Sequence, residues 1–197
     1  MRELAILTFV TLDGVMQAPS LPEEDFSGDF KHGGWARPYW GEVMAQVKEE
    51  AMAVPYDLLL GRRTYEIFAA SFSNSDDDSD PSDITKATKY VATNTLEKLD
   101  WKNSVPIAGN IADEVVQLKA QEGPLLQVHG SWQLIQTLLK SDLVDEFRLW
   151  VFPVIAGSGK RLFGDIFPKQ GLTLVKSRTT ENGVVMTIYR RDNSSKA

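Results

Sequence analysis

Two arginines and a threonine occur together where an apolar run gives way to a helical pattern. The run Asp57–Leu60 is followed by Gly61, Arg62, Arg63 and Thr64, and the glycine allows the tight backbone turn that such a junction needs. The first N–H groups of a helix have no partner within it and favour an anion, and arginine can bind a phosphate through two parallel hydrogen bonds. These residues therefore predict an anion site. The alternative is a solvated helix start with ordinary surface arginines, and this segment alone does not decide between them.

A second junction of the same kind follows the run Leu125–Val128. His129, Gly130, Ser131 and Trp132 lead from it into a helical pattern, so another helix N-terminus is expected there, and Ser131 is placed to cap that helix. Junctions of this type are common in α/β proteins, so this one is weak support by itself. A lone histidine beside a glycine turn is more often structural than catalytic, and we expect the structural role for His129.

Two further strand ends carry short polar side chains. Thr93 and Asn94 stand at the end of one apolar run and could hold a ribose or an adenine edge; the alternative is a plain turn. Asp13 and Gly14 follow the first apolar run, where an Asp-Gly pair permits a sharp turn and a loop that closes over a substrate. Here too the alternative is a simple turn. Asp13 is our candidate for polarising a substrate or relaying a proton.

The residues needed by several other kinds of site are missing from the sequence. The chain has no cysteine, which excludes a disulfide scaffold, a thiolate metal site and a cysteine nucleophile. Its two histidines do not form a His-Glu-x-x-His motif, and no Gly-x-Ser-x-Gly motif is present, so zinc and serine hydrolases are disfavoured. Gly157–Lys160 lacks the leading glycine and the following Ser or Thr of a nucleoside triphosphate loop. We therefore predict no metal site and no such loop.

The segment Ser73–Asp83 contains five aspartates and no basic residue. Asp76, Asp78 and Asp80 alternate as they do in a calcium loop, but the glycine and the glutamate that such a loop requires are absent. We expect a solvated, mobile acidic loop instead.

Short apolar runs separated by helical patterns predict an α/β fold. Strands without polar alternation that are joined by helices indicate a mostly parallel central sheet with helices on both faces. Near the C-terminus, apolar and polar residues alternate on either side of Asn182-Gly183, which predicts an antiparallel hairpin because both residues tolerate a positive φ. We expect about eight strands and three or four helices. The predicted strands are Leu4–Val10, Asp57–Leu60, Tyr90–Thr93, Val105–Ile107, Leu125–Val128, Phe147–Val154, Leu172–Thr180 and Val184–Arg190, and the helical faces contain Trp40, Val43, Met44, Val47 and Ala51, then Ile111, Val115 and Leu118, then Leu134, Ile135, Leu138 and Leu139.

Composition and charge limit the class of protein. The 197 residues suit one domain, which we place at residues 1–191, followed by a flexible tail at 192–197. The formal net charge of −6 argues against nucleic-acid binding. The run Leu4–Val10 is too short for a signal peptide or a membrane helix, which favours a soluble cytoplasmic protein without a membrane partner. Aromatic residues in Trp35–Trp40 and in Phe147–Phe152 suggest a homodimer, although an ordinary core would use the same residues.

Taken together, these motifs resemble the dihydrofolate reductase-like superfamily. The similarity is greatest to stand-alone relatives of the C-terminal reductase domain of the bifunctional riboflavin biosynthesis deaminase/reductase, and it extends from Arg2 to Arg191. It rests on four segments in this order: Thr11–Gly14, Leu60–Glu66, Val128–Ser131 and Phe152–Phe163.

The resemblance implies an NADPH-dependent reductase with a dihydrofolate reductase-like fold. By analogy, Arg62, Arg63 and Thr64, after the turn at Gly61, would hold the 2′-phosphate and the pyrophosphate of NADPH. Gly130, Ser131 and Trp132 would also lie near the pyrophosphate, and Thr93 and Asn94 would lie near the adenosine. Asp13 and Gly14 would border the nicotinamide. The implied substrate is a ribosylaminopyrimidine phosphate or a related heterocycle, as for 5-amino-6-(5-phosphoribosylamino)uracil reductase.

Two alternatives stay open. A dihydrofolate reductase proper would carry an acidic residue on its first helix to hold the pterin ring, and neither Glu42 nor Glu49 matches that position by its distance to Gly61. Dihydrofolate reductases also have Gly-Gly where this chain has His129-Gly130. A non-catalytic nucleotide-binding protein would keep the fold without the reaction.

Overall fold

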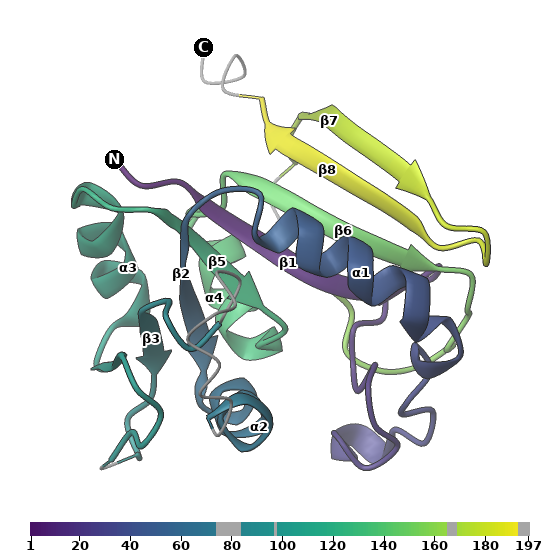
Figure 1. Cartoon of the computed structure of the whole chain (residues 1–197), viewed down its shortest axis with the longest axis horizontal. Helices are drawn as coiled ribbons and strands as arrows, with labels where there is room; N and C mark the ends of the chain where they lie inside the picture. The colour runs from purple at the N-terminus through teal and green to yellow at the C-terminus, as the bar shows by residue number, and fades with distance from the viewer. Residues whose placement is uncertain (74–83, 97, 165–168, 193–197) are drawn as a thin grey trace.

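In the described part of the chain, eight strands form one sheet across the molecule (Figure 1). The computed structural model describes residues 1–73, 84–96, 98–164 and 169–192. The order across the sheet is β4-β3-β2-β5-β1-β6-β8-β7. The strands are β1 (Leu4–Thr11), β2 (Tyr56–Gly61), β3 (Lys89–Ala92), β4 (Ser104–Ile107), β5 (Leu125–His129), β6 (Glu146–Phe152), β7 (Leu172–Thr179) and β8 (Val185–Arg191). Every predicted strand is therefore present, and no end differs by more than two residues.

The sheet is parallel from β4 to β6 and antiparallel beyond. β1 pairs in parallel with β5 and β6, and β2 pairs in parallel with β3 and β5. β8 then pairs antiparallel with both β6 and β7. Seven of the eight residues of β1 are buried, because β1 lies inside the sheet with side chains packed on both of its faces. The predicted mostly parallel sheet with an antiparallel C-terminal hairpin is confirmed.

Among the residues that the structure describes, two α-helices pack on each face of the sheet. α1 (Trp40–Ala51) and α2 (Arg62–Phe72) cover one face, and α3 (Ile111–Ala120) and α4 (Trp132–Lys140) cover the other. Alternate residues of β2 show this division, since Leu58 and Leu60 pack with α2 whereas Leu59 packs with α3 and α4. Two short 3-10 helices, Ser27–Asp29 and Arg37–Tyr39, lie between β1 and α1. The long connection that contains them is bonded to the start of α2, because Arg63 donates to Asp25 and Glu24. It therefore lies near the sheet edge where the parallel strands β1, β2 and β5 end.

The hairpin between β7 and β8 has a three-residue loop. Thr180 N donates to Val184 O at 2.9 Å and Gly183 N donates to Thr180 O at 3.0 Å, so Glu181, Asn182 and Gly183 form the loop. Gly183 has a φ of 86°, and Asn182 has no positive φ. A turn followed by a glycine in the left-handed region is the common three-residue hairpin. The predicted hairpin is present, and only its glycine, not Asn182, adopts the positive φ that the sequence pattern allowed at both residues.

The aromatic residues that suggested a homodimer belong to the core. Trp35 is 8% exposed and Phe152 is fully buried, and their ring centroids lie 5.2 Å apart. Trp35 Nε1 also donates to Gln17 O at 2.8 Å. These residues give no support for an interface, so the homodimer stays a prediction. Apolar side chains are exposed instead on the edge strand β7, where Leu174 is 51% and Val175 is 55% exposed.

Two predictions fall outside the residues that the structure describes. The expected mobile acidic loop covers residues 73–83, of which only Ser73 is described, and the expected flexible tail covers residues 192–197, of which only Asp192 is described. In the described part of the chain, no helix combines the length and the apolar character needed to cross a bilayer.

Candidate functional site

The first turns of α2 and α4 meet at one edge of the sheet. β2 and β5 are parallel neighbours, so their carboxyl ends and the helices that follow share that edge. Ser131 N donates to Thr64 Oγ1 at 3.1 Å, and Ser131 Oγ accepts a hydrogen bond from Gly61 N at 3.0 Å. These bonds join the two junctions that the sequence predicted as anion sites. They form one site rather than two.

Neither of these helix starts has a side-chain cap. Gly61 and Ser131 occupy the N-cap positions of α2 and α4, and neither makes a capping hydrogen bond. The prediction that the Ser131 side chain caps α4 is wrong, because Ser131 has a φ of 57° and its hydroxyl bonds to the other junction. Gly130 is also in the left-handed region, with a φ of 52°. The free N–H groups of both helices therefore remain available to an anion.

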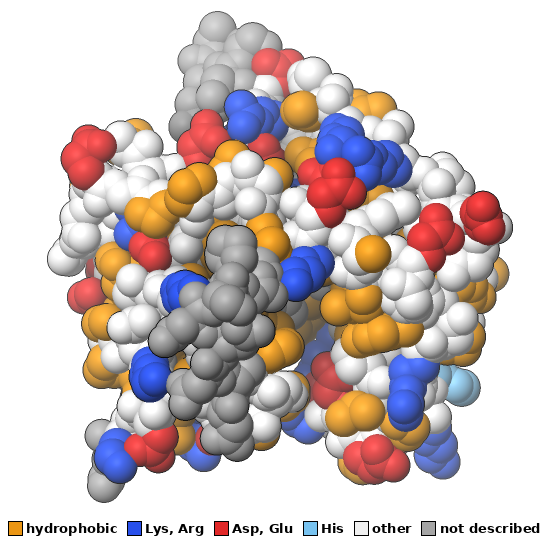
Figure 2. Space-filling view, in the orientation of Figure 1, with side chains coloured by type: hydrophobic (Ala, Val, Ile, Leu, Met, Phe, Trp, Pro, Cys, Tyr) orange, Lys and Arg blue, Asp and Glu red, His pale blue; other side chains and the backbone are white. Residues whose placement is uncertain are grey.

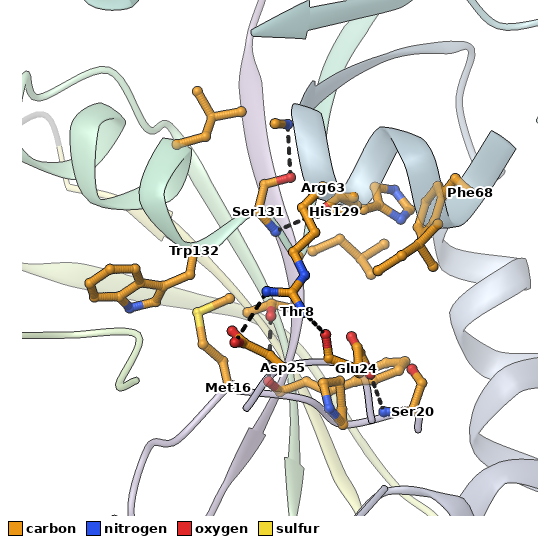
Figure 3. Close-up of a pocket in the computed structure, with 18 of the residues that line it drawn as sticks. Thr8, Met16, Ser20, Glu24, Asp25, Arg63, Phe68, His129, Ser131 and Trp132 are labelled. Carbon is orange, nitrogen blue, oxygen red and sulfur yellow. Dashed lines mark hydrogen bonds and ion pairs between the residues drawn. The ribbon is translucent and has the colours of Figure 1, made fainter. Parts of the chain in front are cut away.

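The two arginines of the predicted anion site point in different directions. Arg62 Nε donates to Glu66 Oε1 at 2.9 Å, and Arg62 Nη1 donates to Thr95 Oγ1 at 2.7 Å, beside the loop that follows β3. Arg63 instead extends across the cleft described below, where Nη1 donates to Asp25 Oδ1 at 3.2 Å and Nη2 donates to the Glu24 carbonyl (Figure 3). The pair thus reaches two separate parts of the site.

A cleft of about 1730 Å³ extends from the paired helix starts to α1. In Figure 2 the surface is hollowed between α2 and the side of the molecule formed by α1 and the connection before it, with hydrophobic side chains along the hollow. We call its two parts the helix-start half and the α1 half. The helix-start half contains Arg62, Arg63, Thr64, Gly130, Ser131 and Trp132. The α1 half contains the mostly apolar residues Met44, Val47, Met52, Ile67, Phe68 and His129, and Lys48 of α1 and Tyr56 also line the cleft. One half therefore suits an anion and the other an apolar ring.

Asp25 is a residue of the cleft that the sequence analysis missed. Its carboxylate accepts hydrogen bonds from Lys160 Nζ at 2.6 Å and from Arg63 Nη1 at 3.2 Å. Burial raises the pKa of Asp25, but hydrogen bonds from Lys160 and Ser27 outweigh this effect and lower the pKa to about 2. Gln17 Nε2 donates to the Asp25 and Ser27 carbonyls at 3.1 and 2.8 Å, which fixes this segment. No local sequence pattern marks these contacts; Lys160 itself belongs to the Gly-Ser-Gly-Lys segment that was rejected as a nucleotide loop.

Asp13 is not among the residues that line the cleft. Its Oδ1 accepts hydrogen bonds from Thr11 Oγ1 at 2.6 Å and from Ala156 N at 3.0 Å, and its Oδ2 accepts one from Gly157 N at 2.9 Å. The hydrogen bond from the Thr11 hydroxyl lowers the pKa of Asp13. Burial opposes this effect, but the N–H groups of Ala156 and Gly157 lower the pKa further, to about 2. A carboxylate with this pKa carries no proton at neutral pH. The geometry makes Asp13 an anchor for the loop after β6 and does not support the expected proton relay.

Gly14 completes the turn that Asp13 begins. Its φ is 81°, its N–H donates to Thr11 O at 2.9 Å, and its carbonyl accepts from Leu162 N at 3.0 Å. A residue with a Cβ is strained at this φ, so the Asp-Gly pattern has a conformational cause here. Gly14, like Asp13, lies outside the cleft lining.

Thr93 and Asn94 shape the loop after β3 and do not line the cleft. Thr93 is 8% exposed, and its Oγ1 accepts hydrogen bonds from Thr95 N at 3.2 Å and Leu96 N at 3.1 Å. Asn94 Oδ1 accepts from Gly109 N at 3.0 Å. Both contacts are those of a turn, the alternative interpretation of this segment. The loop nevertheless brings the Thr95 hydroxyl to Arg62.

Trp132 and His129 line different halves of the cleft. Trp132 Nε1 donates to Arg161 O at 2.9 Å, and the Lys160 ammonium lies 5.5 Å from the centre of the Trp132 ring. His129 is half-buried beside Phe68, at 6.1 Å between ring centroids with the rings at 81°. Burial, aided by the positive charge of Arg148, lowers the pKa of His129 to about 4. Figure 3 shows Trp132 on one side of Arg63, and His129 and Phe68 on the other.

One protein family matches most of the chain. The family described as the RibD C-terminal domain matches residues 2–186. The protein YyaP of Bacillus subtilis (strain 168) is 33% identical over 136 residues, which are 67% of this chain and 72% of YyaP. YwjB of the same organism is 26% identical over 176 residues, 88% of this chain and 89% of YwjB. The names of these two relatives state no activity.

Two solved structures share the fold. A putative riboflavin biosynthesis protein from Shewanella sp. PV-4 has a TM-score of 0.63 and 20% identity over 98% of this chain and 100% of that one. A diaminohydroxyphosphoribosylaminopyrimidine deaminase/5-amino-6-(5-phosphoribosylamino)uracil reductase from Thermotoga maritima has a TM-score of 0.62 and 13% identity over 97% of this chain. The chain corresponds to 57% of the Thermotoga protein.

Proposed function

Because the chain belongs to the RibD C-terminal domain family, we propose that it is an NADPH-dependent reductase. The observation that carries this proposal is the pair of uncapped helix starts at Gly61 and Ser131, joined by hydrogen bonds at the edge of a large cleft. Free N–H groups of two helices directed at one place favour a group with several negative charges, as a pyrophosphate has. The chain's own residues therefore fit a phosphorylated dinucleotide.

Arg62 is the residue that we assign to the 2′-phosphate of NADPH. Its guanidinium is half exposed and lies beside the loop after β3, away from the cleft centre that Arg63 crosses. A 2′-phosphate carries nearly two negative charges and is what distinguishes NADPH from NADH, and arginine binds such a group in bidentate fashion. We assign the pyrophosphate to the helix starts and to Arg63.

The protein's part in the reaction is to bind and orient. When bound, NADPH supplies a hydride to the substrate. Asp25, through Arg63 and Lys160, holds residues 17–27 against the cleft and so limits the access of water. Trp132 and Met16 line the same cleft and offer a flat and an adaptable surface to a ring.

For the substrate we propose a ribosylaminopyrimidine phosphate or a related heterocycle, similar to 5-amino-6-(5-phosphoribosylamino)uracil. The family supports this, as does the name of the Thermotoga structure that shares the fold. A dihydrofolate reductase would place a carboxylate of its first helix in the cleft. In α1, Glu42 accepts a hydrogen bond from Glu181 N, Glu49 pairs with Arg178, and Glu50 pairs with Lys176. None of these glutamates lines the cleft, which disfavours a pterin substrate.

The test is a comparison of turnover with two substrates. Purified protein is mixed with NADPH and either the ribosylaminopyrimidine phosphate or dihydrofolate, and the loss of NADPH absorbance is followed. We expect faster oxidation with the ribosylaminopyrimidine phosphate. Faster turnover of dihydrofolate would reverse the substrate assignment. NADPH binding without turnover of either would favour the non-catalytic nucleotide-binding alternative, and no NADPH binding would contradict the proposed function as a whole.

A further inference from the structure

The α1 half of the cleft contains a histidine whose hydrogen-bonding state is set by a buried glutamine. Gln127 is fully buried, and its Nε2 donates to the Ala51 carbonyl at 2.6 Å. A carbonyl oxygen can only accept, so this contact fixes which end of the Gln127 amide is nitrogen. The other end, Oε1, lies 2.9 Å from His129 Nε2. The amide oxygen of Gln127 is therefore directed at the imidazole.

The position of the proton on His129 follows from this contact. An amide oxygen has lone pairs and no proton, so His129 Nε2 must be the donor and carry the hydrogen. In a neutral imidazole the remaining nitrogen, Nδ1, then has a free lone pair and is an acceptor. The lowered pKa of His129 keeps the ring neutral at neutral pH. His129 is thus an acceptor whose one ring proton is already used.

The acceptor has no hydrogen-bond partner among the described residues, since the only hydrogen bond of His129 there is the one to Gln127. His129 lines the cleft together with Phe68, Met52 and Ile67. These three neighbours are apolar, and the polar residues Lys48 and Tyr56, which also line the cleft, already have interaction partners. A polar ligand group that enters this half therefore finds few free partners besides His129. In such surroundings one well-placed hydrogen bond discriminates strongly between ligands, because a mismatched group stays desolvated and unpaired.

We propose that His129 is a specificity-determining residue that selects a flat ring carrying an N–H or O–H donor. Its Nδ1 accepts a hydrogen bond from that donor, while Phe68 contacts the ring. This inference rests on the proposed function, because it names what the α1 half of the same cleft binds. It defines the substrate class as an amino- or hydroxy-substituted heteroaromatic ring, and it excludes a ring that presents only acceptors at this position.

Nuclear magnetic resonance of the imidazole nitrogens tests the proposal without any enzymatic turnover. The chain has two histidines, so His32→Gln leaves His129 as the only source of signal in a protein with 15N-labelled histidine. In the free protein at neutral pH we expect a proton on Nε2 and none on Nδ1. Addition of 2,4-diaminopyrimidine, at an alkaline pH where this ring is uncharged, should shift the Nδ1 resonance. Unsubstituted pyrimidine, the same ring without donors, should not.

A matched pair of variants separates hydrogen bonding from packing. His129→Asn keeps a polar group that can accept near the position of Nδ1, whereas His129→Leu has nearly the same shape as the asparagine variant without it. Loss of a buried hydrogen bond typically weakens binding about tenfold. We expect the leucine variant to bind 2,4-diaminopyrimidine about tenfold more weakly than the asparagine variant, and both to bind pyrimidine equally. Circular dichroism of both variants checks that the fold is kept.

The two proposals fail in different ways. A protonated Nδ1 in the free protein, an unshifted Nδ1 resonance with 2,4-diaminopyrimidine, or equal affinities of the asparagine and leucine variants for it would each overturn the role of His129. None of these results depends on NADPH. Absence of NADPH binding or oxidation, together with the expected Nδ1 shift, would contradict the proposed reductase and leave the ring site in place.

Discussion

Replacement of Arg62 by alanine should weaken NADPH binding and leave NADH binding nearly unchanged. Arg62 is bonded to Glu66 and Thr95 at the loop after β3, whereas Arg63 crosses the cleft to Asp25. A group that contacts only the 2′-phosphate contributes nothing to NADH, which lacks that phosphate. Arg62→Ala therefore tests the assignment of the 2′-phosphate separately from the assignment of the pyrophosphate to the helix starts.

The size of the effect follows from the contacts that Arg62 already makes. A hydrogen bond between charged groups contributes about 1.5–3 kcal/mol. Against this stands the existing ion pair with Glu66, half exposed and worth about 0.2–1 kcal/mol, which the arginine gives up or shares when it binds the phosphate. The net loss of about 1–2 kcal/mol corresponds to roughly a fivefold to thirtyfold weaker affinity for NADPH.

The assay is a titration of intrinsic tryptophan fluorescence with NADPH and with NADH, since Trp132 lines the cleft. The salt concentration is held fixed, because screening weakens exposed contacts. Arg178→Ala is a matched control: Arg178 is 41% exposed, pairs with a glutamate as Arg62 does, and lies on β7 outside the cleft lining. If Arg62→Ala weakened the affinity for NADPH and for NADH equally, this arginine would have to be assigned to the pyrophosphate instead. If neither affinity changed, the proposed placement of the cofactor would be refuted.

Three further substitutions test other parts of the structure. Asp13→Asn should lower the free energy of unfolding by about 1–2 kcal/mol at pH 6, because the pKa of Asp13 falls from 3.8 to about 2 on folding. This contribution is present above pH 4 and is lost as the pH falls toward 2. Urea unfolding of both proteins should therefore show a difference at pH 6 that disappears near pH 2, and a constant difference would contradict the ionic role. Asp25→Asn frees Arg63 and Lys160 from a carboxylate and should tighten NADPH binding by a fewfold in the same titration; weaker binding would mean that Asp25 holds these cations in place for the cofactor. For the expected homodimer, Leu174→Lys on the exposed edge strand β7 should give a monomer by light scattering; an unchanged dimer would place the interface elsewhere, and a monomeric parent protein would contradict the homodimer.

The features that could be predicted from the sequence are those that a short segment determines by itself. β1 is an unbroken apolar run, and β7 and β8 alternate on either side of Asn182-Gly183, so their patterns indicate a strand or a hairpin wherever they lie. The helix starts at Gly61 and Ser131 follow apolar strands directly, and parallel strands bring their carboxyl ends to one edge. The fold and the meeting of these two helix starts at one edge were therefore accessible, whereas anion binding there stays a prediction.

The features that were missed depend on contacts between distant segments. Asp13 bonds to Gly157 and Asp25 to Lys160, contacts that no local pattern marks. Ser131 has the residue type of an N-cap, but its backbone conformation depends on the junction with which it bonds. Trp35 looks like a surface aromatic beside charged and glycine residues, and only the packing against Phe152 shows that it is buried.

The arginine that crosses the cleft has a consequence for the time course of cofactor binding. Arg63 meets Asp25 between the Trp132 side and the His129 side of the cleft (Figure 3). In the proposed complex with NADPH, Arg63 would therefore exchange the Asp25 carboxylate for a phosphate of the dinucleotide. If the ion pair must open before the cofactor enters, the observed association rate levels off at high NADPH concentration. If entry comes first, the initial rate rises in proportion to concentration and a slower rearrangement follows. Stopped-flow traces of this protein therefore report on the order of two events that an equilibrium affinity combines into one number.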